Sequence, residues 1–78
     1  MTVELLVQFY PQVPAGDRRR VLEELGCLWK EEIRPQHVVV AICEERAVAE
    51  RIRRFLKRPE VAYAELNGSM DLLEGGGR

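Results

Sequence analysis

The stretch RPEVAYAELN, residues 58–67, decides how the chain is organised, because it ends one element and begins another. Arg58 places a positive charge where the C-terminal end of a helix favours one. Pro59 lacks the backbone N–H that would continue such a helix. The residues after it, 61–66, are predicted to form the closing edge strand of a sheet.

The preceding segment, residues 44–57, has the strongest helical pattern in the chain. One face of this predicted helix collects four apolar residues: Val48, Ile52, Phe55 and Leu56. Apolar residues at this spacing are typical of an amphipathic helix that packs on a core.

A β-hairpin is predicted just upstream of that helix. Residues 37–43 are apolar and rich in β-branched side chains, which is typical of a central strand buried on both faces. Residues 27–33 alternate like a second strand, and residues 34–36 are the short turn between them. A short turn between two strands implies that they run antiparallel.

The N-terminal part begins with a strand at residues 3–10, where apolar residues recur at every second position. Pro11 and Pro14 end this strand. Asp17 is expected to cap a short helix at residues 17–25. Gly26 follows at the position where many helices end in a left-handed residue.

The predicted order is therefore strand, helix, strand, strand, helix, strand. Right-handed connections then give an α+β, ferredoxin-like βαββαβ domain, with a four-stranded antiparallel sheet and both helices on one face. We expect the helices to bury their apolar residues against three inward-facing residues of the central strand: Val38, Val40 and Ile42.

This architecture leaves one face of the sheet without helices. Apolar residues are expected on that bare face as well, namely Leu6, Tyr10, Leu28, Val39 and Ala41. A partly apolar surface of this kind usually marks an interface. The sheet is therefore predicted to dock on another molecule.

Composition excludes several classes of protein. The 78 residues are 46% hydrophobic and 32% charged, with a net charge of −1. This balance argues against a disordered chain and against an overall attraction to nucleic acid. The start of the chain shows neither a signal peptide nor a membrane span, so a cytoplasmic location without membrane contact is expected, with secretion expected only if the chain is part of a longer precursor.

No catalytic constellation is predicted, so the chain is not expected to be an enzyme. His37 is the only histidine, and a catalytic triad needs histidine, serine and a carboxylate together. Cys27 and Cys43 lack the spacing of a metal site, and we interpret them as buried thiols rather than a disulfide. No cofactor is expected.

Four stretches of the chain resemble the subtilisin propeptide and proteinase-inhibitor family, which includes the fervidolysin-type prodomains. They are the opening ELLVQF with its proline-rich turn, LEELG before the second strand, VVVAI before the second helix, and the closing PEVAYAELN. Their order and spacing over residues 3–73 are more specific than any one of them.

The resemblance implies a ferredoxin-like domain, residues 1–67, followed by a flexible tail, residues 68–78. In that family the bare sheet face packs on the protease, and the tail enters the active-site cleft. By position, the tail residues that bind the protease are Met70, Asp71, Leu72 and Leu73. The corresponding residues of the strands and the sheet face are Leu6, Val39, Tyr63 and Glu65.

Two functions remain open from the sequence. The resemblance implies a stand-alone inhibitor or folding chaperone of a subtilisin-like serine protease. The alternative is a ferredoxin-like module that pairs through its sheet into a homodimer and serves a regulatory or small-ligand-binding role.

Overall fold

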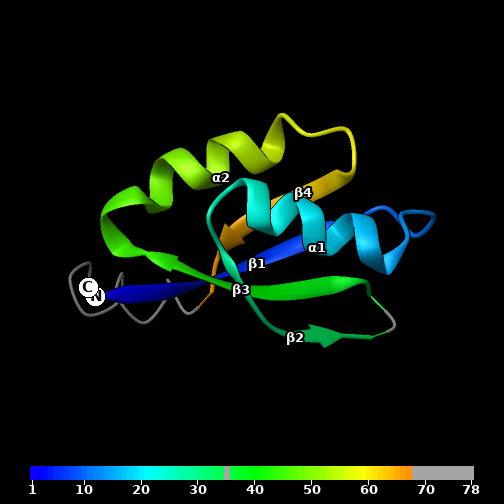
Figure 1. The fold of residues 1–78 in the computed structure, drawn as a ribbon, viewed down its shortest axis with the longest axis horizontal. Helices are drawn as coiled ribbons and strands as arrows, with labels where there is room; N and C mark the ends of the chain where they lie inside the picture. Colours follow the sequence, from blue (N-terminus) through cyan, green and yellow to red (C-terminus); the bar gives the residue numbers. More distant parts are fainter. Residues whose placement is uncertain (35, 68–78) are drawn as a thin grey trace, which may run out of the picture.

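The computed structural model describes residues 1–34 and 36–67. Its elements follow the chain in the predicted alternation, as Figure 1 shows. They are the strand β1 (Thr2–Phe9), the helix α1 (Ala15–Glu24), the strands β2 (Leu28–Ile33) and β3 (Val38–Glu44), a short 3-10 turn η1 (Glu45–Ala47), the helix α2 (Val48–Leu56) and the strand β4 (Val61–Leu66).

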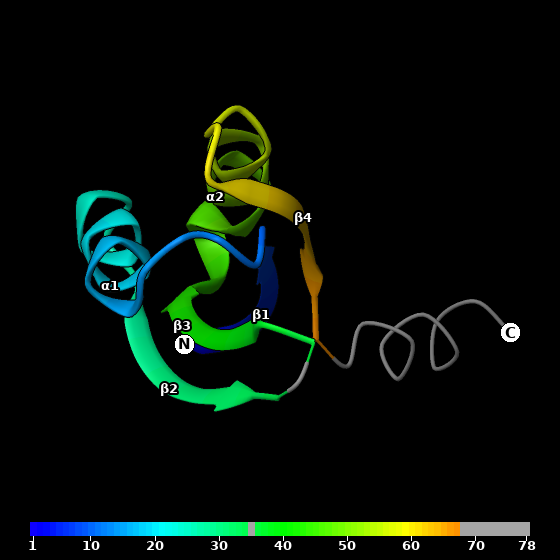
Figure 2. The ribbon, with the colours of Figure 1, turned by 90° about the vertical axis from the view of Figure 1, so that its right-hand side faces the viewer.

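The four strands form one antiparallel sheet in the order β2-β3-β1-β4. The first and third strands therefore lie at the centre, and the second and fourth lie at the edges. Both helices cover the same face of the curved sheet, which is clearest in Figure 2. This is the predicted α+β, ferredoxin-like arrangement.

The core lies between the sheet and the two helices. From the sheet, β1 contributes Leu5, Val7 and Phe9, and β3 contributes Val39, Ala41 and Cys43. From the helices, the most deeply buried side chains are Val21, Leu22 and Phe55. Among residues 1–34 and 36–67, none of the buried residues is polar or charged, so the interior is stabilised by apolar packing.

The prediction for the inward face of β3 was wrong. Leu5 pairs with Ala41 and Val7 with Val39, and all four side chains are buried beneath the helices. Because side chains alternate along a strand, Val38, Val40 and Ile42 point to the opposite face. Val39 and Ala41, expected on the bare face, are core residues.

The two ends of α1 differ in how well the sequence predicted them. The helix begins at Ala15, its N-cap is Pro14, and no side chain caps it, so the expected cap by Asp17 is wrong. Asp17 lies in the first turn, where it pairs with Arg20 at 2.8 Å. At the other end, Gly26 has a φ of 73°, which is the left-handed conformation predicted for a helix stop.

Helices long and apolar enough to cross a membrane do not occur in the part of the chain that the structure describes.

Candidate interaction surface on the open face of the sheet

The sheet face turned away from α1 and α2, here called the open face, is built from three rows of residues that run across the strands. Strand pairing places Leu28, Ile42 and Glu4 in the first row, Glu31, Val40, Leu6 and Glu65 in the second, and Ile33, Val38, Gln8 and Tyr63 in the third. Each row joins residues from several strands, so parts of the chain that are distant in sequence meet on one surface.

The middle of the open face is apolar. β3 contributes Val38, Val40 and Ile42, and Leu6 of β1 lies beside Val40. At the edges, Leu28 is 68% exposed and Tyr63 is 51% exposed. Val40 between them is only 3% exposed, so the most exposed apolar side chains lie at the two edges of the face, where they are suited to binding another protein.

A polar bridge crosses this surface. The Lys30 ammonium donates a hydrogen bond of 2.6 Å to Glu4, and the Asn67 amide donates one of 3.0 Å to the same carboxylate. These hydrogen bonds lower the pKa of Glu4, and the hydrogen bond to Glu4 raises the pKa of Lys30. Because β3 lies between β2 and β1, the Lys30 side chain crosses β3 to reach Glu4.

A break in the pairing of β2 changes which residues face outward after Lys30: Glu31 and Ile33 lie on the open face, and Glu32 lies on the helix side. The register between β2 and β3 shifts between Trp29 and Glu31. Such a bulge adds a residue to one strand and redirects its side chains. Trp29, just before it, packs against the core and lies under the Arg19 guanidinium, 4.2 Å from the ring centre.

The structure brings together three of the sheet residues that the resemblance implied. Leu6 pairs with Glu65 across β1 and β4, and Tyr63 lies in the neighbouring row with its hydroxyl 3.4 Å from Glu65. Val39 is fully buried under the helices and cannot belong to this surface. The implied tail residues Met70, Asp71, Leu72 and Leu73 lie outside the described residues.

Sequence reasoning missed other residues of the open face. Val38, Val40 and Ile42 were assigned to the core, and Ile33 was not assigned to a surface. The alternation of β1 offered one usable signal, since its polar residues Glu4 and Gln8 mark the solvent side. In the register of the sheet these two residues pair with Ile42 and Val38.

On the opposite side of the sheet, ion pairs connect the helices to the rest of the fold. Arg58 joins Glu24 at the end of α1, at 2.9 Å, to Glu60 before β4, at 3.3 Å. Partial burial opposes the charged form of Arg58, but hydrogen bonds to both carboxylates outweigh it and raise its pKa. These contacts hold the elements together and bring no nucleophile near a base.

The described residues also contain no cluster of three or more metal-ligating side chains. Likewise, no pocket opens in the described part of the surface. Among the described residues, the candidate site is the open face of the sheet. Taken together, fold and surface define a ferredoxin-like α+β domain with an apolar open face.

The profile of the fervidolysin N-terminal prodomain family matches residues 2–67, which includes every strand and helix of the fold. The chain belongs to this family and is a propeptide-like domain of the subtilase prodomain type. The family resemblance in the sequence is thereby confirmed. No curated protein gives a significant match to the chain.

Proposed function

We propose that the chain binds a subtilisin-like serine protease through the open face and acts as its inhibitor or as a chaperone of its folding. The observation that carries this proposal is the match of residues 2–67 to a family of protease prodomains. The matched segment includes the complete sheet, so the surface on which the proposal depends lies within the family's own fold.

The chemistry of the open face supports binding to a protein rather than to a small molecule. Its centre is apolar and it has exposed anchors at both edges, Leu28 and Tyr63. A few apolar or aromatic anchors of this kind usually supply most of the binding energy of an interface. The Lys30–Glu4 bridge crosses the face between these anchors and Glu65 lies on β4, and charges in such an interface favour specificity over affinity.

The tail is the second part of the proposed binding site. Residues 70–73 contain Met70, Leu72 and Leu73, apolar side chains that suit a protease cleft with a preference for such residues. In this proposal the open face fixes the position of the domain, and the tail blocks the active site as a product-like peptide.

The test is an inhibition assay of the intact chain against a panel of subtilisin-like proteases. We expect slow, tight inhibition of at least one member. A parallel assay follows the recovery of activity when that protease is refolded from denaturant, with and without the chain. Faster refolding supports a chaperone role. If the chain neither inhibits nor assists any member and forms a stable dimer by sedimentation, the open face is a homodimer interface instead.

A further inference from the structure

The two cysteines lie opposite each other at one end of the β2–β3 hairpin. Leu28 pairs with Ile42 and Trp29 with Ala41, so the same register carried back one residue sets Cys27 opposite Cys43. Both side chains are buried in the core cluster, and both thiols are free. The two residues therefore share a position along the hairpin and the same face of the sheet.

This placement satisfies the backbone requirements of a disulfide. Directly opposed residues in antiparallel strands have Cα atoms about 4.5–5.5 Å apart. Disulfides in proteins bridge Cα atoms about 4.4–6.8 Å apart. Each thiol also makes a weak contact with a backbone carbonyl, Cys27 with that of Leu25 at 3.7 Å and Cys43 with that of Glu44 at 3.6 Å.

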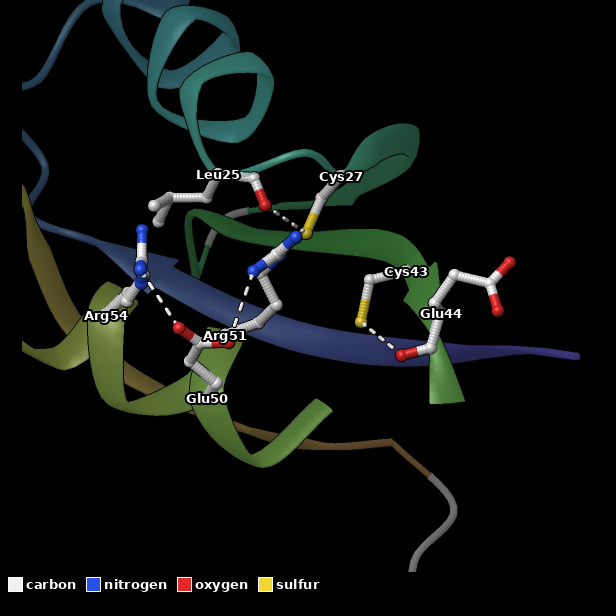
Figure 3. A network of polar contacts seen from close by, with 7 residues as sticks. All are labelled: Leu25, Cys27, Cys43, Glu44, Glu50, Arg51 and Arg54. Atoms are coloured by element: carbon white, nitrogen blue, oxygen red, sulfur yellow. Dashed lines mark hydrogen bonds and ion pairs between the residues drawn. The ribbon is translucent and has the colours of Figure 1, made fainter. Parts of the chain in front are cut away.

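A guanidinium group lies beside this pair. The Arg51 side chain extends from α2 toward the Cys27 sulfur, with Cys43 on the neighbouring strand, as Figure 3 shows. A Cβ at Gly26 would lie 3.2 Å from its Nη2 atom, so the glycine leaves room for the guanidinium. Its Nε atom is buried without a hydrogen-bond partner among the described residues.

Burial and the nearby Arg51 charge set the protonation state of the two thiols in the folded protein. Burial raises the pKa of Cys27 to about 12 and also raises that of Cys43, while the charge of Arg51 acts in the opposite direction on both. In the closed fold the thiols are therefore protonated and unreactive. The Arg51 charge stabilises a thiolate once local opening lets one form.

We propose that Cys27 and Cys43 are a disulfide-forming pair that joins the start of β2 to the end of β3 when a small-molecule disulfide is present. The thiolate of one cysteine attacks that disulfide and releases one thiolate from it. The second cysteine, as a thiolate, then attacks the protein-bound sulfur and releases the other. The protein loses two electrons and two protons, and the small disulfide is reduced to two thiols.

This inference is independent of the proposed protease binding. The crosslink would close a loop of about 15 residues, which constrains the unfolded chain far more than the folded one. The oxidised domain should therefore unfold at a higher temperature, by about 12–24 °C.

The test is to equilibrate the intact chain with reduced and oxidised glutathione, both under native conditions and in concentrated urea. Mass spectrometry quantifies the fraction that has lost two hydrogens, and peptide mapping identifies the linked residues. We expect the native equilibrium constant for the Cys27–Cys43 disulfide to exceed that in urea by about 100-fold. In the native sample, a urea concentration well below the unfolding midpoint is added. It speeds local opening, so that the buried thiols reach equilibrium with glutathione while the domain stays folded.

The matched control is Cys43→Ser, which should form only a mixed disulfide between Cys27 and glutathione. Equal equilibrium constants in native buffer and in urea would overturn the proposal, because the fold would then not favour the bond. Addition of glutathione to both cysteines of the native chain, without the internal disulfide, would overturn it as well.

Discussion

Arg18 of α1 and Glu32 of β2 form an ion pair in which the side chains are only 11% and 10% exposed. This pair connects the first helix to an edge strand that otherwise pairs with β3 alone. Glu32 has a second, more distant partner in Arg34, at 4.0 Å. The Nε atom of Arg18 is buried without a hydrogen-bond partner among the described residues, so the pair is not fully satisfied.

Glu32→Gln should lower the free energy of unfolding by about 3 kcal/mol, because it leaves the Arg18 charge without its carboxylate in a nearly buried site. The double variant Arg18→Met, Glu32→Leu should recover most of that loss, since apolar residues of similar size often replace a buried ion pair without cost. Urea unfolding measures both. If the double variant has a lower free energy of unfolding than Glu32→Gln, the ion pair itself stabilises the fold.

Phe55→Ala should cost about 3–5 kcal/mol, because the Phe55 side chain is fully buried and its removal leaves a cavity. Its neighbour Leu56 is 48% exposed, and Leu56→Ala should change the stability by less than about 0.5 kcal/mol. Thermal unfolding of the two variants compares them directly. Similar melting temperatures for both would contradict the packing described for α2.

Leu28→Asp should weaken inhibition of a cognate protease about 10-fold or more, since it places a charge on the apolar open face. Leu56→Asp is the matched control, because Leu56 is an exposed leucine on the helix layer. Both variants should keep the wild-type melting temperature within a few degrees. Equal inhibition constants for the two would place the binding surface elsewhere.

Removal of residues 70–78 should abolish most inhibition, because it removes the apolar residues proposed to enter the protease cleft. Removal of residues 74–78 alone should leave inhibition unchanged or improve it. Both shortened chains should fold, since the sheet is complete at Leu66. Inhibition by the chain cut after Ser69 that matches that of the intact chain would refute the role of the tail.

The reduced protein should lose stability as the pH rises above about 9. Burial raises the folded pKa of Cys27 from 9.0 to about 12, so the unfolded chain releases a proton that the folded chain keeps. The contribution of Cys27 to the free energy of unfolding is complete below the unfolded pKa. It declines as the pH rises from the unfolded pKa toward the folded pKa, here at roughly 1 kcal/mol per pH unit. Cys27→Ala should show a shallower decline in urea unfolding at pH 8, 9 and 10. An unchanged slope would show that another group dominates.

The sequence predicted the fold well where its pattern was unambiguous. The polar residues Glu4 and Gln8 mark the open face of β1, and Phe55 marks the buried face of α2. In β3 the run Val38-Val39-Val40-Ala41-Ile42 contains no polar residue, so nothing in the run shows which side is inward. Only its register with β1 decides this, and register depends on the whole sheet.

The candidate surface was partly predictable for the same reason. Leu6 lies in a strand whose alternation indicated the correct face, and the family resemblance implied Tyr63 and Glu65, which the register places on the same face. The facing of Glu32 and Ile33 was not predictable, because the bulge in β2 reverses the alternation that the sequence suggests. A bulge is a local change in hydrogen bonding that leaves little trace in residue spacing.

The central position of β1 has a consequence for synthesis of the chain. β1 leaves the ribosome before the other strands of the sheet, and both of its neighbours, β3 and β4, are made later. The last described contact between β1 and the segment after β4 is a backbone hydrogen bond, which the N–H of Asn67 donates to the carbonyl of Glu4 at 2.8 Å. While β4 is still inside the ribosome, β1 has one unpaired edge and α2 lacks its contacts with β4. Such an unpaired edge is prone to aggregation, so the domain is most vulnerable just before its last strand emerges.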